Sequence, residues 1–350
     1  MQLTPELRSL QEEIEEYAKQ FGLDFFQIIY EILDWEEMNQ VASYGGFPTR
    51  YPHWTYGAEY EKISKSYAYG LSKIYEMVIN NDPCYAYLLK SNKVVDQKLV
   101  MAHVCGHCDF FKNNVWFSKT DRKMMDEMAN HAVRIRRYIE KHGFERVEAF
   151  LDTCQSIDRL VDTHGLFIQR EAPTELNSDI DAGRIKVPKL KSADYMDKFI
   201  NPQEFLDEQK QRILDEHNRK KNFPETPQRD VLSFLVDYAP LTEWERDILS
   251  MIREEAYYFT PQAQTKIMNE GWAVFWHSKI MTEHALKDSE LVDYADHHSG
   301  TVAMSQGSIN PYKIGVELFR DIEERWNKGR FGKEYDECTN LAEKKAWDKK

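Results

Sequence analysis

Apolar side chains recur at steps of three and four residues along most of this chain of 350 residues. In the opening segment Leu7, Leu10 and Ile14 keep this spacing, behind Thr4 as a candidate N-cap and Pro5 at the first helical position. Alternation in steps of two, which would indicate strands, is scarce. We therefore expect a mainly α, multi-helix globular fold with at most a few short strands.

Composition divides the chain into four predicted parts. Five prolines and dense charge mark residues 169–230 as an exposed insertion, with one charged helix around Asn201 to Lys220. We expect a helical part with an aromatic loop before it (1–168), a second helical part after it (231–330) and a charged tail (331–350). In the second helical part, helical periodicity returns in "DVLSFLVDYAPLTEWERDILSMIREEAYYF" and in "PQAQTKIMNEGWAVFWHSKIMTEHAL", which are interpreted as successive helices.

The charge balance limits the classes of partner. Lys and Arg total 46 against 59 Asp and Glu, a formal charge of −13, which disfavours nucleic acid and anionic lipid. The sequence contains no run of about 18 apolar residues, the length that a membrane span needs. The acidic N-terminal segment does not resemble a signal peptide. Five cysteines without a framework spacing fit a reducing compartment. We expect a cytoplasmic protein.

Two motifs overlap in "LVMAHVCGHCDFFKNN", residues 99–114. Cys105 and Cys108 have the spacing of a redox dithiol, but they lie in the middle of an apolar helical pattern that no βαβ pattern surrounds, so we interpret them as buried apolar side chains. His103 and His107 share one helix face and could hold one metal ion. Hydrogen bonding within the core is the alternative for each histidine.

A second polar position lies in "MNEGWAVFWH", residues 268–277. Glu270 and His277 fall on one stripe of a helix that is otherwise rich in large apolar groups. An unpaired carboxylate buried there would cost several kcal/mol, so Glu270 either faces water or has a partner.

Long stretches of the chain resemble one family. "FGLDFFQIIYEI", "YGGFPTRYPHW", "AHVCGHCDFFKNN", "IMNEGWAVFWH" and "SINPYKIGVELFRDIEERW" together resemble the SpoVR family, the stage V sporulation protein R group, from Phe21 to Trp326. The resemblance implies a role in spore cortex formation or in the stress response, without an agreed reaction. Members of the family usually continue with a smaller C-terminal region, so it also implies a short member or a trimmed chain.

A weaker resemblance concerns the metal. "NEGWA" is similar to the segment from which gluzincin peptidases supply their third zinc ligand. The resemblance implies that Glu270 binds the ion together with His103 and His107. It also implies a zincin-like fold around the site. Val104 stands where those peptidases have their general base, so the base is not carried over. Zn²⁺ is the expected ion, with Fe²⁺ as the alternative for the same ligands.

Four residues are candidates for the missing base. Asp109 and His277 are the predicted catalytic residues, and Glu254 and Glu255 are weaker alternatives. The resulting hypothesis is a metal-dependent hydrolase that acts on a small molecule or peptide, at an amide bond of a peptidoglycan precursor or of a regulator. The alternatives are a non-heme iron enzyme, and a scaffold with a vestigial metal site that binds protein partners through the charged insertion.

Four further histidines are assigned lesser roles. His53 either packs in the aromatic loop or lines a pocket with Arg50 and Trp54. His131 is interpreted as a core or interface residue. The adjacent His297 and His298 are interpreted as solvated side chains of a polar loop.

Overall fold

The computed structural model describes residues 2–69, 73–168, 187–192, 196–220, 228–304 and 307–347. The chain divides into two compact units, Met1–Asp158 with Leu241–Lys350, and Arg159–Pro240. It is mainly α-helical, as predicted. The helices of the first unit are α1 (Pro5–Gln20), α2 (Trp35–Ser43), α3 (Trp54–Ala68), α4 (Val94–Asn113), α5 (Met124–His142), α6 (Phe144–Ser156), α11 (Glu243–Ile280), α12 (Leu291–Thr301), α13 (Pro311–Asn327), α14 (Lys333–Glu337) and α15 (Leu341–Lys345).

A small sheet accompanies the helices of the first unit. Its strands are β1 (Ile28–Leu33), β2 (Glu76–Ile79) and β3 (Cys84–Leu89), in the order β1-β3-β2. β1 runs parallel to the central β3, and β2 runs antiparallel to it. β2 therefore forms one edge of the sheet.

Helix α4 is the centre of the first unit. All its residues from Val95 to Phe111 are buried except Leu99, because α1, the sheet and α11 pack around it. Ile14 of α1, Leu88 of β3 and Ile280 of α11 belong to the same core cluster. A helix buried on all sides must satisfy each of its polar side chains internally, so its two histidines need partners.

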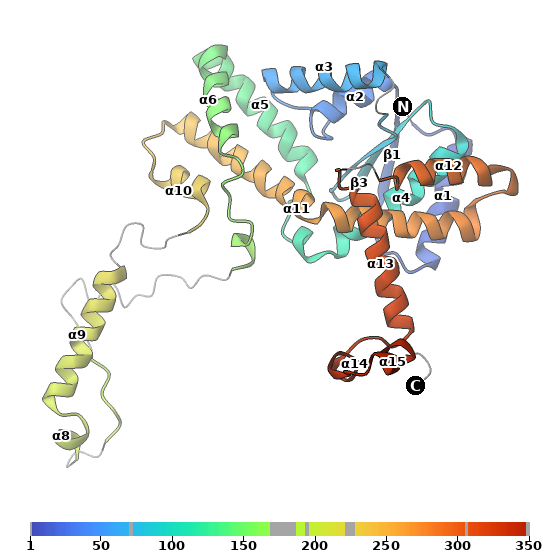
Figure 1. Ribbon diagram of the computed structural model, residues 1–350. Coiled ribbons are helices and arrows are strands. Elements are labelled where there is room, and N and C mark those ends of the chain that lie inside the picture. Colours follow the sequence, from blue (N-terminus) through green and yellow to red (C-terminus); the bar gives the residue numbers. More distant parts are fainter. Residues whose placement is uncertain are drawn as a thin grey trace. The chain divides into compact units, whose positions relative to one another are not determined.

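Glycines allow α11 to approach two other helices closely. A Cβ atom at Gly106 of α4 would lie 2.7 Å from the Cα atom of Ala273, and one at Gly271 would lie 2.3 Å from the backbone of Gly315 in α13. Figure 1 shows α13 crossing the C-terminal half of α11. These contacts flank the histidines of α4 and Glu270 of α11. They therefore fix the distance between the histidines and the glutamate.

Helix α11 differs from the prediction of two successive helices. It continues from Glu243 to Ile280 through Pro261, and a π-helical turn, Met281–Ala285, follows it. Proline removes one backbone donor and crowds the preceding turn. Here Tyr258 and Thr265 are buried on either side of it, so packing against neighbouring elements holds the helix together.

The second unit contains α8 (Asp197–Ile200), α9 (Gln203–Lys220) and α10 (Val231–Tyr238). The predicted charged helix is confirmed as α9. Asn201 ties the chain before α9 to residues 187–192, because its side chain accepts a hydrogen bond from the Leu190 amide and donates one to the Leu190 carbonyl. Much of the predicted insertion, 169–230, lies outside the described residues, and the four-part division stays a prediction.

In the described part of the chain, every helix is too short or too polar to cross a membrane.

Candidate metal centre

Three predicted ligands converge in the core of the first unit. His103 and His107 come from adjacent turns of α4, and their Nε2 atoms lie 3.0 Å apart. The Glu270 Oε2 atom of α11 lies 3.6 Å from the first of these nitrogens and 3.5 Å from the second. Two helices that are far apart in the sequence thus bring one atom each from three side chains to a common point.

The donor set fits a metal ion. In a tetrahedral zinc site with bonds of about 2.0–2.1 Å, two ligand atoms lie about 3.3 Å apart, close to the separations found here. Glu270 Oε2 is buried and has no hydrogen-bond partner of ordinary geometry. An orphaned carboxylate oxygen in a core is costly, and a cation between the three atoms would remove that cost.

Each imidazole is oriented through its other nitrogen. His107 Nδ1 lies 2.8 Å from Asn269 Oδ1, and because an amide oxygen only accepts, Nδ1 carries a proton and Nε2 is the atom available as a ligand in the neutral ring. His103 Nδ1 lies 3.0 Å from His277 Nδ1. Such partners behind ligating histidines fix the ring orientation and the tautomer.

His277 contacts His103 with one ring nitrogen and His298 with the other. Its Nε2 atom lies 3.3 Å from His298 Nδ1, so three imidazoles form a row from the cluster to α12. Burial first, and then the neighbouring imidazoles, hold the pKa of His277 well below its usual value, so the ring is neutral. The predicted catalytic residue His277 therefore supports His103, and a catalytic role for it stays a prediction.

The electrostatics of the cluster favour an ionised Glu270. Burial opposes its ionisation, but interaction with His103 and His107 lowers its pKa below the usual value. Burial alone would lower the pKa of His107, but the contacts with Glu270 and Asn269 outweigh burial and raise this pKa. A charged carboxylate opposite two imidazoles is the state in which these side chains bind a divalent cation.

Two residues beside the cluster were missed by sequence reasoning. Glu76 is the first residue of β2; burial raises its pKa, although the charges of His103 and His107 oppose the shift. Tyr312, near the start of α13, has its ring centroid 6.1 Å from that of His103, and burial and the nearby Glu270 raise its pKa. In the sequence Tyr312 is one aromatic residue within "SINPYKIGVELFRDIEERW" and has no distinguishing pattern, and Glu76 lies on a strand too short to show a period.

Two cavities border the cluster. One, of about 560 Å³, is lined by His103 and His277, and the other, of about 550 Å³, is lined by His107 and Glu270. Glu76 and Tyr312 line both. Volumes of this size are typical of small-molecule and peptide sites. The cluster is therefore buried in the core and yet borders space for a ligand.

Asp109 makes its contacts elsewhere. Its Oδ1 atom accepts hydrogen bonds from the Asp24 amide (2.8 Å) and from Asn113 Nδ2 (3.0 Å), and its Oδ2 atom accepts one from Trp272 Nε1 (2.8 Å). Both oxygens are thus engaged in joining α4 to α11 and to the segment before β1. The predicted catalytic role of Asp109 gains no support from these contacts and stays a prediction.

The dithiol alternative is not supported. Cys105 and Cys108 are fully buried within α4, and burial raises the pKa of both thiols. A reactive cysteine needs a stabilised thiolate and access to a reactant. The interpretation as buried apolar side chains fits their position.

Glu254 and Glu255 belong to a second cluster, around the buried His131, in which Glu255 is buried and Glu254 is exposed. His131 contacts Glu255 Oε1 at 3.0 Å and Glu254 Oε2 at 3.3 Å, and Arg50 Nη2 lies 2.6 Å from Glu255 Oε2. His131 is fully buried, as its interpretation as a core residue requires. The two glutamates are thus committed to an ion-pair network around His131 and Arg50.

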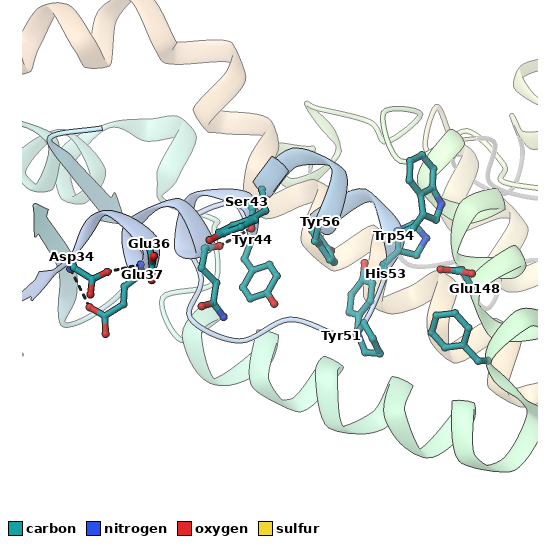
Figure 2. Close-up of a pocket in the computed structure, with 15 residues that line it drawn as sticks. Asp34, Glu36, Glu37, Ser43, Tyr44, Tyr51, His53, Trp54, Tyr56 and Glu148 are labelled. Carbon is teal, nitrogen blue, oxygen red and sulfur yellow. Dashed lines mark hydrogen bonds between the residues drawn. The ribbon is translucent and has the colours of Figure 1, made fainter. Parts of the chain in front are cut away.

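The aromatic loop lines a cavity of its own, of about 990 Å³ (Figure 2). His53 and Trp54 both line it, whereas Arg50 turns away to Glu255. His53 is also packed, with its Nδ1 atom 2.7 Å from Thr55 Oγ1. Two of the acidic residues that line this cavity, Asp34 and Glu37, cap the N-terminus of α2.

The interpretation of His297 and His298 is wrong in one respect. Both lie on α12 and not in a loop, and both are partly buried. His297 pairs with Asp96 of α4, and His298 contacts His277. Helix α12 packs a polar face with histidines against α4 and has no apolar stripe. Because apolar periodicity is the signal from which a helix is predicted, the sequence contained no indication of this helix.

The fold and the cluster together define a mainly α protein with a candidate mononuclear site of two histidines and one glutamate. Comparison with known sequences then gives the family. The profile of the family described as "SpoVR like protein" matches residues 2–350, and this chain belongs to that family.

One curated relative shows how far the likeness extends. The chain is 32% identical over 336 residues to the uncharacterized protein YcgB of Escherichia coli (strain K12), in a match that covers 89% of this chain. The match spans 62% of the length of that relative. None of the solved structures matches the chain.

Proposed function

We propose that this SpoVR-family chain is a metal-binding, hydrolase-like protein that cleaves an amide bond, in a peptidoglycan precursor or in a protein that controls cortex assembly. The observation that carries the proposal is the buried Glu270 Oε2 atom, which has no hydrogen bond of ordinary geometry and lies within 3.6 Å of two imidazole nitrogens. His103, His107 and Glu270 would hold the ion, and zinc is the first expectation.

Three protein ligands leave room for a substrate, which is typical of catalytic rather than structural zinc. An ion held there supplies Lewis-acid activation of water or of a carbonyl. In amide hydrolysis, water adds across the C–N bond, and the products are a carboxylate and an amine. The proton of the attacking water needs an acceptor, and the Glu76 carboxylate beside both cavities is our candidate, because Val104 occupies the position of the gluzincin base.

Metal analysis is the first test. We expect protein purified without chelator to contain close to one equivalent of zinc or iron, and His103→Ala, His107→Ala and Glu270→Ala variants to lose it. His142→Ala, which changes a partly exposed histidine at the end of α5, is the matched control and should keep the metal. Elemental analysis of the same samples distinguishes iron from zinc. Metal-free wild-type protein from chelator-free preparations would contradict the proposal.

Hydrolysis is tested separately. Purified peptidoglycan precursors are incubated with wild-type protein and with Glu270→Ala, and the products are analysed by mass spectrometry. The expected result is a pair of fragments whose masses sum to that of the precursor plus one water, with wild-type protein only. A protein that retains its metal, cleaves no precursor and still supports the sporulation or stress phenotype would favour the scaffold alternative.

A further inference from the structure

The outer edge of β2 carries backbone groups that the sheet does not use. The Leu89 amide of β3 donates to the Tyr75 carbonyl, and the Cys84 amide donates in the other direction, to Gln27 before β1. In an antiparallel pair every second residue is hydrogen-bonded to the neighbouring strand, and Tyr75 is such a residue. Met77 therefore pairs with β3, whereas the N–H and C=O groups of Glu76 and Val78 point away from the sheet.

A cavity lies along this edge. Glu76, Met77 and Val78 all line the cavity of about 550 Å³ that also contains His107 and Glu270. Side chains of consecutive strand residues point to opposite faces of a sheet, so a space lined by all three must meet the edge of the strand. The unpaired backbone groups of β2 thus border the same space as the candidate metal ligands.

The space continues past the cluster. The second cavity, of about 560 Å³, is lined by Tyr75, Glu76 and His103, and it shares the lining residues Glu76 and Tyr312 with the first. Together the two cavities follow β2 from Tyr75 to Val78 and pass both histidines. Such a path suits an extended chain better than a compact ligand.

Charge differs between the two ends of this path. Lys266 is the sole Lys or Arg among the described residues that line either cavity, and it lies at the end that contains His107. The other end is lined by Asp296 and by Asp96, which pairs with His297 of the same lining. A ligand with a carboxylate at one end and a neutral or cationic group at the other would match this difference.

We propose that β2 binds an extended peptide as an additional strand, with a carboxylate of the peptide toward Lys266 and a backbone amide of the peptide beside His103, His107 and Glu270. This inference rests on the proposed function in that it names the substrate class of the same site. Backbone pairing with Glu76 and Val78 gives affinity with little dependence on side chains, as is typical of strand addition to a sheet edge.

The test measures binding rather than turnover. The probe is a fluorescein-labelled hexapeptide of alternating alanine and valine that ends in glutamate, and binding is followed by fluorescence anisotropy. Val78→Pro removes an N–H group that points away from β3, so the β2–β3 hydrogen bonds remain. Val78→Ala is the matched control, because it shortens the side chain and keeps the N–H group. We expect Val78→Pro to bind at least about fivefold more weakly than Val78→Ala.

Hydrogen exchange gives a second readout on unmodified protein. Peptide binding should slow exchange of the Glu76 and Val78 amides, and the same peptide with every backbone nitrogen methylated should leave their exchange unchanged. Equal affinity of the two Val78 variants for the probe, or unchanged exchange at β2 with the probe bound, would overturn the inference.

Failure of the inference can be told apart from failure of the proposed function. Binding is measured with protein as purified and with Glu270→Ala. If both bind the peptide and neither contains metal, strand addition holds and the hydrolase proposal fails. If wild-type protein contains metal and cleaves a substrate without protection of β2, the hydrolase proposal holds and strand addition fails.

Discussion

Asn269 and His277 hold the two imidazoles of the candidate centre from behind. Both residues lie on α11, the helix that also supplies Glu270, so one helix positions the third ligand and orients the other two. The "NEGWA" motif indicated only part of this arrangement, the role of Glu270. Glu270 was implied as a ligand, but Asn269, its neighbour in the chain, was given no role because an asparagine before a helix carboxylate has many ordinary uses.

Replacement of Asn269 tests this support. In Asn269→Ala, His107 loses the acceptor that fixes its Nδ1 proton, so we expect metal affinity to fall by about 10- to 100-fold while the fold is kept. Competition with a chromogenic chelator measures the affinity. Asn269→Asp keeps an acceptor and should recover most of the loss, and Asn340→Ala, at the N-cap of α15, is a control without effect. Equal affinities in all four proteins would show that Asn269 does not orient His107.

His131 makes a separate prediction about pH. Burial lowers its pKa, but contacts with Glu254 and Glu255 outweigh this and raise the pKa to about 9, from about 6.5 in an unfolded chain. A raised pKa stabilises the fold fully below pH 6.5, and this stabilisation is lost as the pH rises through 9. We expect it to contribute up to about 3 kcal/mol.

Denaturant unfolding of wild type and His131→Gln at pH 6 and pH 9.5 measures this contribution. The variant should be less stable at pH 6, and the difference between the two proteins should shrink at pH 9.5. A difference that stays constant or grows with pH would contradict a protonated His131. The fold of the variant is checked by circular dichroism before the comparison.

At the scale of whole elements, helix crossings rather than helix propensities position the site. Most helices followed from apolar periodicity, and α4 was predicted from its apolar run. The continuity of α11 through Pro261 did not follow, because a proline ends most helices and only tertiary packing reveals an exception. β2 has four residues, too few for a period, so Glu76 and the sheet edge were hidden as well.

The close crossing of α11 and α13 predicts a strong effect of one methyl group. In Gly271→Ala the new Cβ atom would lie 2.3 Å from the Gly315 backbone, so the helices must separate beside Glu270. We expect a loss of about 3 kcal/mol or more in the free energy of unfolding, together with weaker metal binding. Gly57→Ala in α3 meets no atom within 4 Å and should stabilise by about 0.5–1 kcal/mol.

Denaturant titration and metal content are measured for both glycine variants. A Gly271→Ala protein as stable as wild type, with full metal content, would show that the crossing tolerates separation. Gly57→Ala controls for the general effect of adding a methyl group to a helical glycine.

Across the whole molecule, the candidate centre joins distant parts of the chain. His107 and Asn269 are 162 positions apart, and the second compact unit intervenes between them in the sequence. Sequence reasoning could place His103 and His107 on one helix face because that relation is local. The approach of Glu270 to them depends on Gly106, Gly271 and their contacts across helices, which no local pattern encodes, so the third ligand came only from resemblance to another family.

Because the candidate ligands come from α4 and α11, a bound ion should link the first unit's two central helices and raise its thermal stability. An ion at 100 to 1,000 times its Kd stabilises the native state by about 2.7–4.1 kcal/mol when it binds the folded protein alone. We expect calorimetry to show an unfolding transition that shifts upward with zinc and downward with chelator in wild type. Glu270→Ala should unfold at the same temperature under both conditions, since it lacks the third ligand. A zinc-dependent shift of equal size in Glu270→Ala would mean that the ion binds elsewhere, for example to the cysteines, and that the two helices are held together by packing alone.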